Sequence, residues 1–480
     1  MGSDEKRNYI YNIIYRLSIC ILPLIVTPYV ARVLGAQQVG IYSFTSTVAC
    51  YFILFGKLGL DNYGNRSIAS CRDDEEARSR VFWGIYLMQV VTSLLSILIF
   101  ILLILTVIKE NRSIYWIQLM YVGSVLFDVS WFFYGMEKFR TTTIRSLISR
   151  SLIILFVYIF VHSEMDLWIF TCIMSASFLF EQIMLVPFLI HQVRFVPLTK
   201  KDILCHIIPS IKLFVPLLAL SVYHWMDKIM LGILVQSTAV VAFYTYAEGI
   251  INLPKGILTA LDTVMLPRIS HLVANHRIEE SIQKMQHSIR FNSLVSCALC
   301  FGIAGVSPRF VPWFLGTEFT PTVLLTISLA MVMIPMSVAD VVQTQYLIPF
   351  QKESVYIRSV SLGALINVIL NLILIPFYGA FGAVLGTFGA ELMVCAYQML
   401  HIKDIYRFRQ LYQTLLPFVL CGALEFAVTY SLCRLKISTL PLLILQVFTG
   451  GIVYLSGCCF YFIVIRKEYR NMNDIIKKLK

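Results

Sequence analysis

The chain has 480 residues, of which 58% are hydrophobic and only 14% are charged, and its mean hydropathy is +0.77. Soluble globular domains hold roughly 45–50% apolar and 25% charged residues, so an ordinary soluble protein and a disordered chain are both excluded. Lys and Arg outnumber Asp and Glu by 39 to 27, which gives a net charge of +12. The positions of these basic residues decide between a nucleic-acid binder and a membrane protein with charged loops.

Long apolar segments recur along the whole chain. A helix needs roughly 20 mostly apolar residues to cross a hydrocarbon layer about 30 Å thick, and about 14 segments meet that requirement. Their cores are 8–30, 39–60, 81–108, 113–134, 147–161, 167–190, 211–234, 239–261, 291–314, 322–348, 359–376, 379–401, 411–433 and 439–464. The predicted fold class is an all-α polytopic membrane protein without room for a soluble catalytic domain.

The basic residues predict how the chain is oriented. If the N-terminus is cytoplasmic, 29 of the 39 Lys and Arg residues fall in the two terminal segments and the cytoplasmic loops, and only five fall in the opposite loops. Short cytoplasmic loops carry such an excess. We therefore predict a multi-pass protein of the cell membrane with both termini in the cytoplasm. The positive charge reflects topology, and no nucleic-acid partner is expected.

A weak internal similarity predicts the domain organisation. Arg32-Val33-Leu34-Gly35, before the second span, is matched about 200 residues later by Lys228 with Leu231-Gly232. The offset is six spans, which keeps both copies in the same orientation and is typical of parallel repeats that hold a substrate between two lobes. We predict an N-terminal six-helix lobe over 1–200, a C-terminal six-helix lobe over 201–403, and spans 13 and 14 with a basic tail over 404–480.

Charged residues inside the spans mark the candidate site. An ionised side chain at the bilayer centre costs at least roughly 2.5–3.5 kcal/mol, so a set of them predicts ion pairs or a polar cavity. We expect cations to bind an anionic substrate and carboxylates to serve in coupling or ion pairs. No catalytic residue, metal ligand or cofactor is expected. The proposed substrate-binding cations are Arg16, Arg32, Lys228 and Lys255, and the proposed coupling or ion-pairing carboxylates are Asp128, Glu181, Asp227 and Glu248.

Short motifs in two blocks of the chain identify a family resemblance. The first block runs from Asn8-Tyr9-Ile10-Tyr11-Asn12 through Gly40-Ile41-Tyr42-Ser43, and the second holds Asp227-Lys228-Ile229-Met230-Leu231-Gly232 and Leu266-Pro267-Arg268. In these motifs the chain resembles the polysaccharide transporter family, the Wzx-type oligosaccharide flippases. That family is part of the multidrug/oligosaccharidyl-lipid/polysaccharide exporter superfamily.

The resemblance implies a MATE-like bundle that is not an enzyme. It also implies a function, the export of a polyprenyl-pyrophosphate-linked oligosaccharide, such as a capsule or O-antigen repeat unit, across the cytoplasmic membrane by alternating access. Arg and Lys suit the pyrophosphate of such a substrate. The implied partners are this lipid-linked substrate, the lipid bilayer and a polysaccharide polymerase or glycosyltransferases. A multidrug or cation antiporter of the same superfamily is the nearest alternative. A membrane glycosyltransferase or polymerase is disfavoured because the outer loops are short.

Overall fold

Helices make up all the regular structure that this computed structural model describes. The structure describes residues 3–190, 192–235 and 237–465, and for residues 3–21, 223, 464 and 465 it describes the main chain alone. No β-strand occurs in that part of the chain, which confirms the predicted all-α fold class. The chain divides into two compact units, the first ending at Ala242 and the second beginning at Phe243.

The first unit contains the helices up to α10. Short 3-10 turns, labelled η, join some of them. In chain order the elements are α1 (Ser3–Lys57), α2 (Leu60–Ser70), α3 (Glu75–Thr106), α4 (Arg112–Gly123), η1 (Ser124–Phe127), α5 (Ser130–Gly135), α6 (Phe139–Phe160), η2 (Glu164–Asp166), α7 (Leu167–Ile183), α8 (Val186–Ile190), α9 (Lys200–Leu204) and α10 (Ile207–Leu234).

The second unit follows with longer helices, of which α11 begins just before the boundary. Its elements are α11 (Ala239–Ala274), α12 (Ile278–Leu315), η3 (Thr317–Phe319), α13 (Pro321–Ala330), α14 (Met333–Val342), η4 (Gln343–Leu347), α15 (Glu353–Tyr378), α16 (Ala380–His401), α17 (Phe408–Leu432), α18 (Thr439–Phe460) and η5 (Tyr461–Ile465). Both η4 and η5 are π-helical turns.

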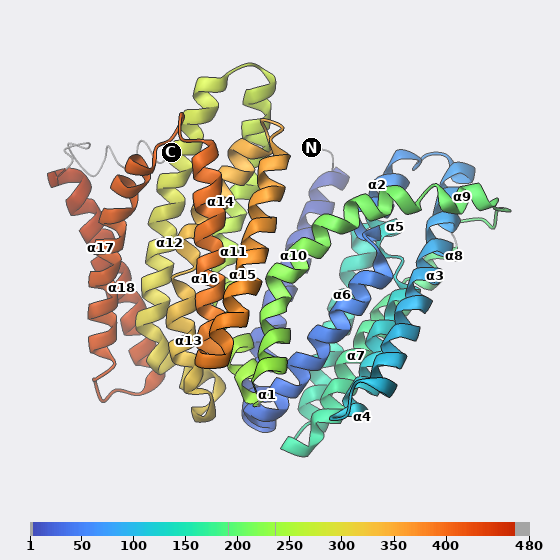
Figure 1. Ribbon diagram of the computed structural model, residues 1–480, viewed down its shortest axis with the longest axis horizontal. Coiled ribbons are helices and arrows are strands. Elements are labelled where there is room, and N and C mark those ends of the chain that lie inside the picture. The colour runs from blue at the N-terminus through green and yellow to red at the C-terminus, as the bar shows by residue number, and fades with distance from the viewer. Residues whose placement is uncertain (1–2, 191, 236, 466–480) are drawn as a thin grey trace. The chain divides into compact units, whose positions relative to one another are not determined.

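The number of membrane crossings agrees with the sequence. Thirteen of the described helical stretches are long and apolar enough to span a membrane. The first of them, Leu22–Ser70, contains Gly35, whose φ of 72° and ψ of 170° break α1. Figure 1 shows the chain of the first unit turning back near the α1 label. Counting the stretches before and after Gly35 separately, the described residues hold the fourteen crossings predicted above, in the same order.

Buried aromatic side chains hold the short helices of the first unit together. Phe82 of α3 stacks on Trp131 of α5 with their ring centroids 5.5 Å apart, and it meets Phe132 edge-on. Gly64 allows α2 to approach α5, because a Cβ at this position would come 2.5 Å from Cε3 of Trp131. The packing fixes α2 and α5 beside each other, at the end of the unit where α1 also ends (Figure 1).

Apolar side chains also cover the outer surface of the helices. On α3, the leucines at 94, 98, 102 and 105 are all exposed and recur at intervals of three or four residues. Residues at this spacing share one face of a helix. A continuous exposed apolar stripe would be unfavourable in water, so this face is suited to contact with lipid.

Candidate functional site: ion pairs at a broken helix

The fourth crossing of the membrane is a broken helix. After α4, the chain passes through η1, and Asp128 takes up an extended ψ of 101° before α5 begins. The hydroxyl of Ser124 donates to the carbonyl of Tyr121 at 2.6 Å, a bond that bends helices. The break places a carboxylate inside a span and frees main-chain carbonyls, which need hydrogen-bond partners in a membrane.

Gln89 of α3 supplies those partners. Its Nε2 donates to the carbonyls of Val125 and Asp128, at 2.6 and 2.8 Å, and its Oε1 accepts the indole N–H of Trp131 at 2.9 Å. Gln89 is almost completely buried. One side chain from a neighbouring helix therefore stabilises both sides of the break.

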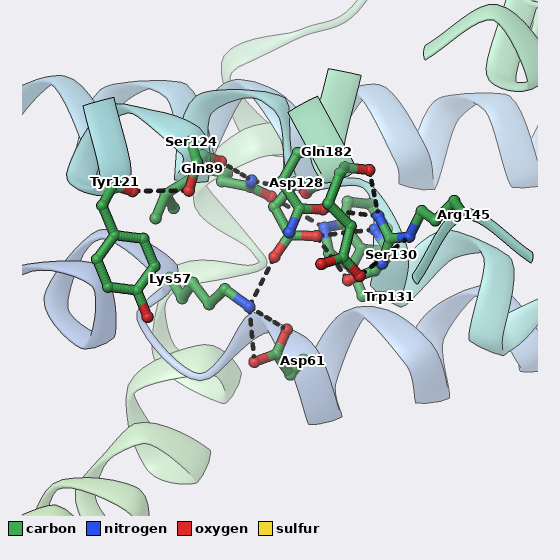
Figure 2. A network of polar contacts seen from close by, with 12 residues as sticks. Lys57, Asp61, Gln89, Tyr121, Ser124, Asp128, Ser130, Trp131, Arg145 and Gln182 are labelled. Carbon is green, nitrogen blue, oxygen red and sulfur yellow. Dashed lines mark hydrogen bonds and ion pairs between the residues drawn. The ribbon is translucent and has the colours of Figure 1, made fainter. Parts of the chain in front are cut away.

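The carboxylate of Asp128 is paired with Lys57, the last residue of α1. Nζ of Lys57 lies 2.6 Å from Oδ2 of Asp128 and 3.0 Å from Oδ1 of Asp61 on α2, so the ammonium group lies between two carboxylates (Figure 2). The side chain of Asp128 is only 2% exposed, against 24% for Lys57 and 53% for Asp61. Its other oxygen accepts from the main-chain N–H and the hydroxyl of Ser130. A single lysine thus joins α1, α2 and the broken helix.

A second buried cation lies between α6 and α7. Arg145, which is 5% exposed, donates through Nη1 to the main-chain carbonyl of Glu181 at 3.0 Å and to Oε1 of Gln182 at 2.8 Å. Its Nε is 3.7 Å from Oε1 of Glu181, and that oxygen also accepts from the hydroxyl of Ser146 at 2.5 Å. Figure 2 shows Arg145 and Gln182 in the same polar network as Asp128.

Loops at the same end of the unit are tied by basic side chains. Arg72 pairs with Glu137 at 2.9 Å, and Arg78 donates to the carbonyl of Gln192 at 3.0 Å. Nζ of Lys138 donates to Oε1 of Gln192 at 2.6 Å. Desolvation, together with the nearby charge of Arg78, lowers the pKa of Lys138. These contacts fix the loop after α5 to the loop after α2 and to the segment that follows α8.

Another polar surface lies where α10 packs against α1. Tyr51 meets Trp225 edge-on at 5.5 Å and donates to the carbonyl of Ser221 at 3.2 Å. Asp227 is almost fully buried and acts electrostatically on Tyr51. Lys228 acts in the same way on Cys50, the neighbour of Tyr51 in α1. Aromatic rings beside charged groups form a surface suited to sugars and anions.

The predicted site residues lie in several places. Asp128 and Glu181 form the ion pairs described above, and Asp227 and Lys228 lie on α10 and act electrostatically on residues of α1. Arg32 is exposed, three residues before the break in α1. Glu248 and Lys255 are on α11 in the second unit, where Lys255 acts electrostatically on Asp340. The side chain of Arg16 lies outside the described part of the structure.

Two cations of the network were not singled out from the sequence. Lys57 lies near the end of the predicted span 39–60, and its spacing of four from Asp61 is that of a helical ion pair. Arg145 lies just before the predicted span 147–161, which places it in a cytoplasmic loop. The structure corrects this, because α6 begins at Phe139 and buries Arg145.

Comparison with protein families gives two matches that each cover more than half of the chain. A family model described as polysaccharide biosynthesis protein matches residues 6–273, and one described as lipid II flippase MurJ matches residues 153–446. The chain is also 24% identical over 404 residues to a putative O-antigen transporter of Escherichia coli (strain K12), covering 83% of this chain and 97% of that protein.

Two solved structures share the fold. A lipid II flippase MurJ in an inward closed conformation superposes with a TM-score of 0.77 at 16% identity, over 95% of this chain and all of that one. An inward-facing multidrug resistance MATE family transporter gives a TM-score of 0.59 at 12% identity, over 87% and 95% of the two chains. The expected MATE-like bundle is confirmed, as is the expected family resemblance.

Proposed function

Since the chain belongs to the polysaccharide biosynthesis protein family, we propose that it is a flippase for a polyprenyl-pyrophosphate-linked oligosaccharide. The protein would move this lipid from the cytoplasmic to the outer leaflet by alternating access, as one step in making a surface polysaccharide. The observation that carries the proposal is the match to the putative O-antigen transporter, which covers 83% of this chain and 97% of that protein. In this role the protein transports its lipid without changing it chemically.

We further propose that the protein lies in the cytoplasmic membrane with both termini in the cytoplasm. The excess of basic residues in the loops on the side of the termini supports this orientation. Cysteines introduced singly at Asp73 and at Glu110 test it, since these positions lie in loops on opposite sides. A membrane-impermeant maleimide added to intact cells is expected to label the variant at 110 and not the one at 73, and the reverse pattern contradicts the orientation.

The cations of the spans would hold the pyrophosphate. We assign this role to Arg16, Arg32, Lys228 and Lys255, and a coupling or ion-pairing role to Asp128, Glu181, Asp227 and Glu248. Lys228 supports the assignment best, because it shares its helix with Trp225 and lies close to α1. Charge-neutral replacements such as Lys228→Gln are expected to reduce export, whereas full export by variants neutralised at Arg16, Lys228 and Lys255 contradicts the role.

Lys57 is paired with two carboxylates, and it would bind the substrate by exchanging one of them for a pyrophosphate oxygen. The pair with Asp128 is buried, whereas the pair with Asp61 is exposed, and exposed pairs contribute little to stability. A pyrophosphate oxygen could therefore displace Asp61 without uncovering Asp128.

Polymerases or glycosyltransferases that make and extend the oligosaccharide are the proposed partners.

Deletion of the gene in its host tests the function. Cells without the protein are expected to accumulate the lipid-linked oligosaccharide in the inner leaflet and to lose the surface glycan, and a plasmid copy should restore both. Normal glycan export in the deletion strain, with no second flippase present, would contradict the proposal. If the cells instead lose resistance to cationic drugs and keep their glycan, the protein is an antiporter.

A further inference from the structure

A cluster of buried polar side chains in the second unit has no part in the site described above. Asp262 of α11 is only 4% exposed, and Asn292 of α12 and Gln345 of the π-helical turn η4 are fully buried. Nδ2 of Asn292 donates to Oδ1 of Asp262 at 3.4 Å. The side chain of Gln345 also faces the Asp262 carboxylate. Three separate elements thus direct polar groups to one buried position.

Several atoms of this cluster have no hydrogen-bond partner. They are Oδ2 of Asp262, Oδ1 of Asn292 and Oε1 of Gln345, whereas Nε2 of Gln345 is directed to the Asp262 carboxylate. Buried polar groups in folded proteins are nearly always paired, and an unpaired one needs an explanation such as an ion or a water molecule. Here the unpaired atoms include one oxygen from each of three side chains, and oxygen atoms of this kind can serve as ligands of a cation.

The backbone supports the same interpretation. A π-helical turn is rare, costs stability in an otherwise α-helical span, and is frequent at functional sites. In this chain it extends over Gln343–Leu347, directly after α14; it contacts α12, and its Gln345 side chain faces Asp262 of α11.

We infer that Asp262, Asn292 and Gln345 form a binding site for a monovalent cation, Na⁺ in the first instance. Carboxylate and amide oxygens are ligands for hard cations. One carboxylate balances one positive charge, and the nearby Asp340 is offset by Lys255. The described residues contain no cluster of three or more His, Cys, Asp or Glu side chains that could hold a metal ion, which disfavours zinc and other transition metals.

Binding of Na⁺ to the purified full-length protein in detergent tests the inference. Sodium chloride, in place of choline chloride at equal ionic strength and constant pH, is expected to raise the unfolding temperature in a saturable manner. Asp262→Asn should weaken the apparent affinity for Na⁺ by at least about tenfold, since loss of a group that merely supports a metal ligand already costs roughly 10–100-fold. Glu391→Gln removes an equally buried carboxylate of α16 and should leave the affinity unchanged.

A second variant keeps the test decisive if Asp262→Asn does not fold. Gln345→Leu retains the carboxylate and removes one oxygen ligand, so radioactive sodium should bind to it more weakly than to the wild-type protein. The inference is contradicted if the wild-type protein gives no response specific to sodium, as expected for a site filled by water or titrated by a proton. Unchanged sodium affinity in a folded Asp262 or Gln345 variant contradicts it too. Because no lipid-linked sugar is present, the result is independent of the proposed flippase function.

Discussion

Nζ of Lys57, at the end of one helix, lies 2.6 Å from Oδ2 of Asp128, at the break of another. Lys57 is the charged partner of this buried carboxylate, and the hydroxyl and N–H of Ser130 donate to its other oxygen. Removing one member of a buried pair leaves the other charge without compensation. The pair therefore links the position of α1 to the conformation of the fourth crossing.

The replacement Lys57→Met tests this link. It leaves Asp128 buried and uncompensated, and we expect a loss of stability approaching the roughly 3–5 kcal/mol typical of such changes. Adding Asp128→Asn should recover part of that loss, because the two residues share one interaction. Unfolding of the purified variants in detergent measures both effects. A single variant as stable as the wild-type protein would show that the ion pair does not contribute to stability.

Gln89 and Gln118 are both buried amides, but they differ in the number of hydrogen bonds that they make. Gln89 bonds to two carbonyls and an indole, whereas Nε2 of Gln118 has no partner and its Oε1 accepts one long bond from Ser175. Gln89→Leu should destabilise the protein by about 2–3 kcal/mol, since it leaves buried groups unpaired. Gln118→Leu should cost less than about 1 kcal/mol. Equal unfolding midpoints for the two variants would contradict the role given to Gln89.

Arg145 offers a comparison between a buried and an exposed arginine on one helix. Arg145→Met removes the partner of Glu181 and is expected to cost about 3 kcal/mol. Arg140→Met changes an exposed residue of α6 and should alter stability by less than about 0.5 kcal/mol. Thermal unfolding of both variants under the same conditions makes the comparison. A similar small change for each would contradict the buried role given to Arg145.

The segment around Thr238 lies close to α1 at Gly40, and Gly123 serves as an uncrowded glycine for comparison. A Cβ at Gly40 would come 1.9 Å from the carbonyl oxygen of Thr238, whereas no atom lies within 4 Å of a Cβ at Gly123. Gly40→Ala should destabilise the first unit by about 1–3 kcal/mol through overpacking. Gly123→Ala should be neutral or stabilising by up to about 1 kcal/mol. Chemical denaturation of the two variants measures the difference. A higher denaturant midpoint for Gly40→Ala than for Gly123→Ala would contradict the close packing at Gly40.

Sequence reasoning predicted the crossings better than the site. The length of an apolar segment is enough to locate a span. The segment between the first two predicted spans, 30 to 39, is short, and the chain reverses there at Gly35, whose backbone is not helical. The break at Asp128 has no such local signal, because it depends on Gln89 from another helix to satisfy its carbonyls. The burial of Arg145 depends in the same way on Glu181 and Gln182 of α7. Tertiary partners, which no single segment contains, decide which charges form the site.

Transbilayer movement in proteoliposomes measures the proposed activity most directly. The purified protein is reconstituted with a polyprenyl-pyrophosphate-linked oligosaccharide that carries a terminal galactose, and galactose oxidase added outside reports the sugar in the outer leaflet. We predict that the oxidised fraction rises with time beyond that of protein-free vesicles, and that Lys57→Met slows the rise. A folded, reconstituted protein that leaves the oxidised fraction at the level of protein-free vesicles would contradict the proposal that the chain is a flippase for such lipids.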